Sequence, residues 1–76
     1  MDRATLLDHL ALAEQHVAEG WRHIERQREI IKGLESQGHD ATTAEELLRT
    51  YERSLSLHVA DRDRIRKELF ATDKAT

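Results

Sequence analysis

The sequence predicts an all-α fold, an antiparallel two-helix hairpin that resembles a coiled coil. Apolar residues recur every seven positions in both halves of the chain, and the repeat is interrupted at Gly38, His39 and Asp40. The 76 residues include no proline and no cysteine, and 36% of them are charged. This composition is typical of long exposed helices rather than of a small domain held by disulfides or zinc. We therefore expect residues 1–76 to form one helical-hairpin domain.

The first helix is expected over about residues 3–36, where two apolar rows form a seam along one side. Asp2 or Thr5 can cap its start, because short polar side chains accept hydrogen bonds from the first free N–H groups. Gly38 suits the position just past its end, where the backbone is often left-handed. The two rows of the seam are Leu10, Val17, Ile24 and Ile31, and Leu6, Ala13, Gly20, Gln27 and Leu34.

The second helix is expected over about residues 43–71, after a turn at about residues 37–42. Asp40, Thr42 and Thr43 compete as its N-cap. The apolar period is lost after Phe70, so we expect the last residues to fray. So short a turn forces the helices to pack antiparallel. The seam of this helix consists of Leu48, Leu55, Arg62 and Leu69, and of Ala44, Tyr51, His58 and Ile65.

One register of the two helices matches their edges best. In this register residue i of the first helix lies opposite about residue 75 − i of the second. Apolar residues then meet apolar residues, and opposite charges meet. A slip by one heptad is the alternative, and it loses most of these pairs. The expected edge pairs are Ile30 with Leu47, Trp21 with Val59, Arg28 with Glu52, Glu14 with Arg66, His16 with Asp61, and His9 with Glu68.

His9, His16 and His23 are spaced by seven and therefore lie on one edge of the first helix. Neighbours in this row are separated by about 10.5 Å of helix rise, so no two of them can bind one ion. We interpret them as solvated side chains that face acidic partners, and a metal site completed by a second chain is the alternative. His58 and Arg62 fall on the seam, where polar residues usually fix the register. We predict no catalytic residue, no metal site within the chain and no cofactor.

A second apolar stripe on the first helix points away from the seam, and residues of the second helix extend it. Apolar residues at helical spacing on so thin a hairpin indicate an interface. Chains this short rarely bury enough surface alone, so we expect a homodimer that forms a four-helix bundle. Ala4 begins the stripe, and Leu12 also points outwards. The predicted partner-binding residues are Leu7, Ala11, Ala18, Trp21, Leu57 and Phe70.

Charge and hydropathy exclude two classes of partner from the prediction. Twelve Lys and Arg against fifteen Asp and Glu give a net charge of -3, and the two signs are interleaved. Nucleic acid is not expected, because it requires a basic stripe that neutralises several phosphates. No apolar run approaches the roughly 20 residues that span a bilayer, and the first residues lack a targeting pattern. We expect a cytoplasmic protein without membrane contact.

Four segments resemble small uncharacterised proteins of soil and plant-associated alphaproteobacteria. They are AEQHVAEG at 13–20, HIERQREII at 23–31, GHD at 38–40 and HVADRDR at 58–64, and the resemblance extends over nearly the whole chain. It implies a bacterial, cytoplasmic helical hairpin. It implies no activity, ligand or site residue.

These observations favour a non-catalytic module for self-association or protein interaction, or a regulatory module. The alternative is a small regulator that binds a signalling or nucleic-acid-associated protein through the stripe of the first helix. An enzyme with a site of His and acidic residues between two subunits is the third hypothesis. Metal in the purified protein favours the third, and a co-purified partner separates the first two.

Overall fold

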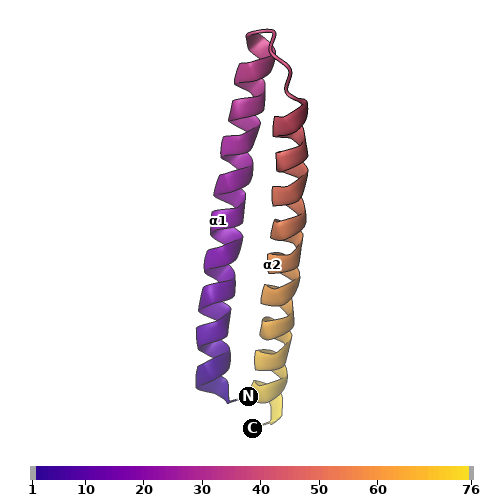
Figure 1. Ribbon diagram of the computed structural model, residues 1–76. Coiled ribbons are helices and arrows are strands. Elements are labelled where there is room, and N and C mark those ends of the chain that lie inside the picture. The colour runs from indigo at the N-terminus through magenta and orange to yellow at the C-terminus, as the bar shows by residue number, and fades with distance from the viewer. Residues whose placement is uncertain (1, 76) are drawn as a thin grey trace.

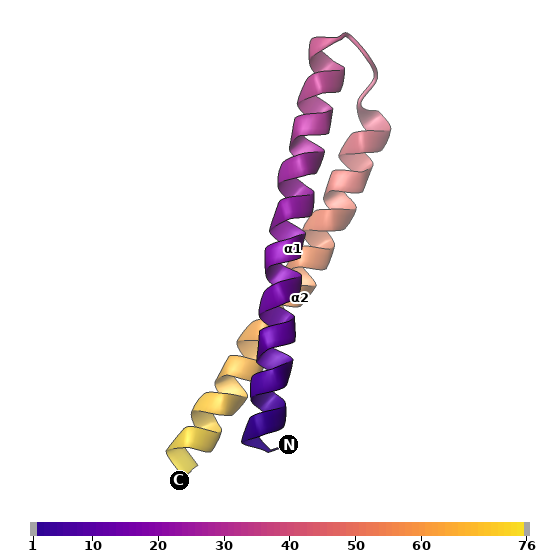
Figure 2. The same cartoon turned by 90° about the vertical axis from the view of Figure 1, so that its left-hand side faces the viewer.

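The computed structural model describes residues 2–75, and the side chains of residues 2–74. Two helices, α1 (Arg3–Ser36) and α2 (Thr42–Ala75), lie side by side and run in opposite directions (Figure 1). Seen after a quarter turn, α2 crosses behind α1 (Figure 2). The predicted all-α two-helix hairpin is confirmed, whereas its dimerisation stays a prediction.

An aspartate shortly before each helix accepts hydrogen bonds from the first residues of that helix. Asp2 Oδ1 accepts from the backbone N–H of Thr5 at 2.8 Å, and this bond lowers the pKa of Asp2. Asp40 Oδ1 accepts from Thr42 Oγ1 at 2.7 Å and from the Thr42 N–H at 3.0 Å. These two bonds lower the pKa of Asp40, the hydroxyl bond more than the backbone bond. Asp2 is therefore the N-cap of α1, as predicted. Asp40 lies one residue before the N-cap position of α2, which is held by Ala41, whose carbonyl accepts from the Glu45 N–H at 2.8 Å.

Helix α1 ends in a Schellman motif. Gly38 has φ 72°, which an L side chain rarely adopts. The Gly38 N–H donates to the carbonyl of Glu35 at 3.1 Å, and the His39 N–H donates to the carbonyl of Leu34 at 2.9 Å. Carbonyls left free by the helix end are thereby satisfied, as expected for a left-handed residue after the helix.

Helix α2 continues past residue 71 to Ala75, where the sequence predicted fraying. The prediction considered only the loss of the apolar period, but polar contacts extend the helix. Thr72 Oγ1 donates to the carbonyl of Glu68 at 2.9 Å, and Arg3 of α1 forms an ion pair with Asp73. The Lys74 ammonium lies 5.1 Å from the centre of the Phe70 ring, an attractive cation–π arrangement.

The core is the predicted seam, and it consists of two apolar clusters. Ile24, at 1% exposure, is the most deeply buried large side chain. Among the described residues, the buried apolar side chains all occupy seam rows, except Ala41, which directly precedes α2. The first cluster contains Leu6, Ala13, Ile65 and Leu69, with Leu10 against it; the second contains Val17, Ile24 and Leu55, with Leu48, Tyr51 and Val59 against it.

Gln27 is a buried polar residue in this apolar seam. Its Nε2 donates to the carbonyl oxygen of Ala44 at 2.9 Å, and the residue is 5% exposed. The sequence placed Gln27 on the seam without predicting this partner. Because a buried amide without a partner is costly, the bond favours the one register in which Ala44 lies within reach.

The predicted register is confirmed by contacts at three levels of the hairpin. A Cβ added at Gly20 would lie 3.6 Å from Leu55 Cβ, so these two positions face each other. On one edge Arg66 Nη2 lies 3.2 Å from Glu14 Oε2, and Arg28 Nη2 lies 4.0 Å from Glu52 Oε2. Both ion pairs are among the expected edge pairs, and the heptad-slipped alternative contains neither.

The hairpin is long and thin, so most of its side chains touch solvent. It measures 60 × 14 × 14 Å, and its radius of gyration is 17.3 Å. A compact domain of this length would have a radius of gyration of about 11 Å. Neither helix, over the residues described, has an apolar stretch long enough to cross a bilayer.

The two caps should contribute stability that acid removes. Folding lowers the pKa of Asp2 and Asp40 below the ordinary 3.8, so their contribution is present above that value and is lost as the pH falls through the folded pKa. NMR titration of the side-chain carboxyl carbons should therefore give both groups a pKa under 3.8. Asp40→Asn keeps a capping oxygen that does not titrate and should weaken the loss of melting temperature in acid. An unshifted Asp40 would contradict the account of its cap.

Candidate functional site

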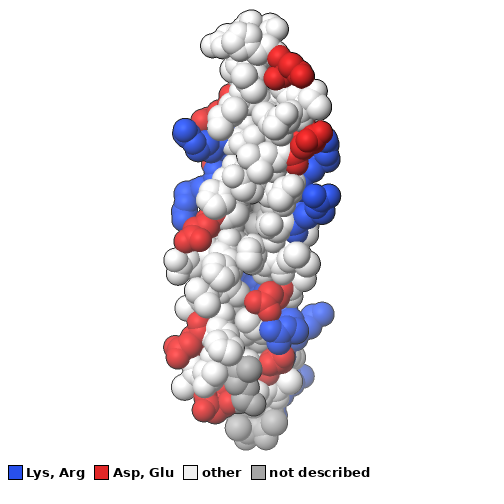
Figure 3. Space-filling view, viewed as in Figure 1, with Lys and Arg blue, Asp and Glu red and all other residues white. Residues whose placement is uncertain are grey.

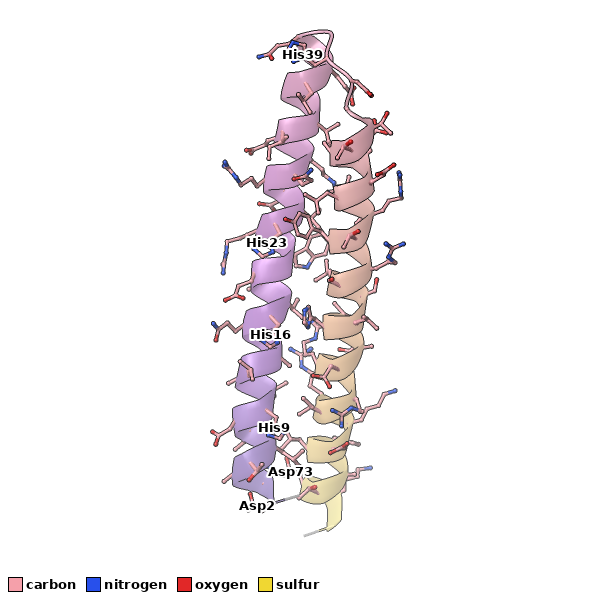
Figure 4. The ribbon with its side chains drawn as sticks, viewed as in Figure 1. Asp2, His9, His16, His23, His39 and Asp73 are labelled. Carbon is pink, nitrogen blue, oxygen red and sulfur yellow. The ribbon has the colours of Figure 1, made fainter. Side chains whose placement is uncertain are left out.

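His9, His16 and His23 form one row along α1, as their spacing predicts (Figure 4). We use the name histidine side for this edge of α1 and for the exposed positions of α1 and α2 that lie next to it. His16 is half-buried, and its ring centre lies 4.9 Å from that of His58 on α2, with 47° between the ring planes. The ring centre of His23 lies 5.4 Å from that of Tyr51. The row is therefore partly packed against α2 rather than fully solvated.

A small cavity opens beside Gly20 on the histidine side, with a volume of about 80 Å³. Gly20 contributes only backbone to its wall, and residues of both helices surround it. Its lining is rich in polar side chains that carry chemistry. The residues that line it are His16, Glu19, Gly20, His23, Tyr51, Ser54 and His58.

The expected pairs of His16 with Asp61 and of His9 with Glu68 are wrong for the residues described. Both carboxylates bind Arg64 instead, each at 2.7 Å from a guanidinium nitrogen. These bonds raise the pKa of Arg64, the bond to Asp61 more than the bond to Glu68. Arg64 lies three and four residues from the two acids on the same helix, where side chains meet without crossing the seam.

The opposite edge of the hairpin carries the confirmed ion pairs, and we call it the tryptophan side. Glu14, Trp21 and Arg28 are spaced by seven along this edge of α1. The pairs Glu14–Arg66 and Arg28–Glu52 therefore place Trp21 midway between two fixed points, level with Val59. Val59 packs against the second apolar cluster, whereas Trp21 is 49% exposed. The contact of Trp21 with Val59 stays a prediction.

The six predicted partner-binding residues are all exposed, but the register divides them between the two sides. Leu7 is 44% exposed, and Ala11 and Ala18 are also exposed; all three lie with Trp21 on the tryptophan side of α1. By the same heptad positions, Phe70 of α2, 63% exposed, lies on that side. Leu57, at 72% exposure, lies on the histidine side and does not extend the stripe.

Part of the surface carries few charged side chains. In Figure 3 most Lys, Arg, Asp and Glu side chains lie toward the margins of the view, and a largely uncharged band runs between them. Exposed ion pairs add little to stability, and among the described residues only the three that join α1 to α2 can favour one register. The stability of the hairpin therefore comes mainly from its seam.

The chemically most capable groups are the imidazoles beside the cavity, because imidazole nitrogens bind transition metals. Within residues 2–75, no set of three or more His, Asp or Glu side chains gathers as the ligands of one ion would. The sequence analysis missed the contact between His16 and His58. It considered pairs along one helix and assigned His16 to an acid, although the confirmed register places His58 next to His16.

Comparison with known protein families, curated proteins and solved structures finds no match to this chain. The resemblance to small alphaproteobacterial proteins and the absence of catalytic residues therefore stay predictions.

Two glycines of α1 allow a test of the close packing beside the cavity. A Cβ at Gly33 meets nothing within 4 Å, so Gly33→Ala should stabilise the protein by about 0.5–1 kcal/mol through helix propensity. A Cβ at Gly20 would lie 3.1 Å from Leu55 Cδ1, so Leu55 must shift. We expect Gly20→Ala to be less stable than Gly33→Ala by about 1 kcal/mol or more in urea unfolding. Equal stabilisation by both would show that the helices do not pack closely at Gly20.

Proposed function

We propose that this chain is a non-catalytic self-association module, and that two copies pair through their tryptophan sides into a four-helix bundle. The observation that carries the proposal is the surface of the single hairpin. Its accessible area is 5664 Å² for a mass of 8.8 kDa. A compact monomer of that mass exposes about 4,800 Å².

The excess area has the size of a protein interface. The difference is about 900 Å², and each partner in a standard interface contributes about 800 Å². One second copy is therefore enough to bring the exposed area of each chain to that of a compact protein. Leu7, Trp21 and Phe70, three of the exposed large apolar residues, lie on the tryptophan side.

Small and large apolar side chains lie along the tryptophan side of α1, and Glu14 interrupts them. Ala11 and Ala18 allow another helix to approach closely, while Leu7 and Trp21 project on either side of these two alanines. Tryptophan is enriched among residues that contribute most to binding. The charges on this side are also favourable, since Glu14 and Glu52 are already paired with arginines. Covering the side leaves neither carboxylate as an unpaired charge.

Sedimentation equilibrium tests the proposal directly. At micromolar concentration the protein should have about twice its chain mass of 8.8 kDa, and its melting temperature should rise with concentration. Leu7→Glu with Ala11→Glu places two charges in the proposed interface. This double variant should be a poorly folded monomer whose melting temperature no longer depends on concentration.

The matched control adds the same charge to the opposite side. Leu12→Glu with Leu57→Glu changes two exposed residues that lie on the histidine side, and the dimer should persist. A stable, cooperatively melting monomer of the unmodified chain would overturn the proposal. If only the control variant dissociates, the interface lies on the histidine side and the proposal is wrong. If a different protein co-purifies in place of the second copy, the result favours a regulator that binds another protein.

A further inference from the structure

The structure brings two metal-binding side chains together from different helices of one chain. His16 lies on α1 and His58 on α2, and their ring centres are 4.9 Å apart. Both residues are half-buried, and both line the cavity beside Gly20. Two imidazoles that pack across a seam do not require a cavity beside them.

We propose that His16 and His58 bind one divalent transition-metal ion across the seam of the hairpin. A bond from zinc to imidazole nitrogen is about 2.0–2.1 Å, which puts a bound ion about 3.2 Å from each ring centre. Two ring centres 4.9 Å apart then subtend about 100° at the ion, between the angles of octahedral and tetrahedral coordination. The spacing of the ring centres is therefore short enough for one nitrogen of each ring to bind the same ion.

Water completes the coordination shell, and the cavity has room for it. Its volume is about 80 Å³, enough for several water molecules. Glu19 also lines the cavity, and its Oε1 accepts from Gln15 Nε2 at 3.0 Å. Because no group of three or more ligands gathers among the described residues, the protein supplies the two imidazoles.

This ligand set determines which ions bind. Imidazole favours Cu²⁺, Ni²⁺ and Zn²⁺, and Cu²⁺ binds most tightly to a given nitrogen site. Mg²⁺ requires oxygen ligands and should not bind. The site forms only when α1 and α2 are in register, so a bound ion stabilises the folded hairpin by mass action. Both ligands belong to one chain, and the site does not depend on self-association.

Thermal melting with added metal tests the site. Cu²⁺, Ni²⁺ and Zn²⁺, each tested separately, should raise the melting temperature of the unmodified chain, with Cu²⁺ acting at the lowest concentration, while Mg²⁺ has no effect. His16→Gln and His58→Gln should each abolish the rise. His9→Gln and His39→Gln remove histidines outside the cavity and should keep it. No rise in the unmodified chain, or a rise that survives both His16→Gln and His58→Gln, would overturn the proposal.

NMR of the imidazole rings gives a second readout that does not depend on the stability of the variants. Zn²⁺ added to the unmodified chain should shift the ring nitrogen signals of His16 and His58 together, and the shifts should be complete at one ion per chain. Shifts confined to other histidines, or completion at half an ion per chain, would contradict a site built within one hairpin.

Discussion

One helix–helix seam in one register holds this protein together. Residues 2–75 contain no third helix or strand, so the buried apolar side chains of α1 pack against α2. Leu55 is received at Gly20, where a missing side chain lets the helices approach. A shift of either helix by one heptad would bring a different residue to Gly20 and separate Gln27 from Ala44. The register therefore determines which residues meet at the edges and which side chains surround the cavity.

Polar residues on the seam show how this single constraint is enforced. Gln27 binds a backbone carbonyl of α2, and His58 lies against His16. Arg62 Nε donates to Asp63 at 3.1 Å, so the guanidinium leaves the seam and is neutralised by its neighbour on α2. Each of the three lowers the apolar area that the seam buries, and the first two gain a contact that exists in one register only. These polar residues lower the stability of a small core and favour one register over the alternatives.

Much of the fold could be predicted because the seven-residue period is strong. It located both helices and both rows of the seam, and it predicted the facing of Gly20 and Leu55. The left-handed Gly38 and the cap at Asp2 follow from local backbone chemistry. The end of α2 was misjudged because Thr72 and Asp73 extend the helix through polar contacts, which an apolar period does not register.

The candidate site was less predictable, because it depends on competition between partners. Asp61 can pair with Arg64 on the same helix or with His16 across the seam. The register taken from the sequence does not show which of the two it binds, and in the structure it binds Arg64. A heptad pattern also treats an edge position and a seam position as separate rows. The contact of His16 with His58 joins one of each, and the cavity beside it depends on the volumes of neighbouring side chains.

The most direct measurement of the central claim is a disulfide designed into the seam. Cβ atoms at positions 20 and 55 would be 3.6 Å apart, within the range for disulfides, and the chain has no other cysteine. Under mild oxidation, Gly20→Cys with Leu55→Cys should close within one chain and raise the melting temperature, as judged by intact mass and non-reducing electrophoresis. Gly20→Cys with Arg62→Cys, the pair of the slipped register, should stay reduced. The opposite preference would contradict the register and the interactions that depend on it.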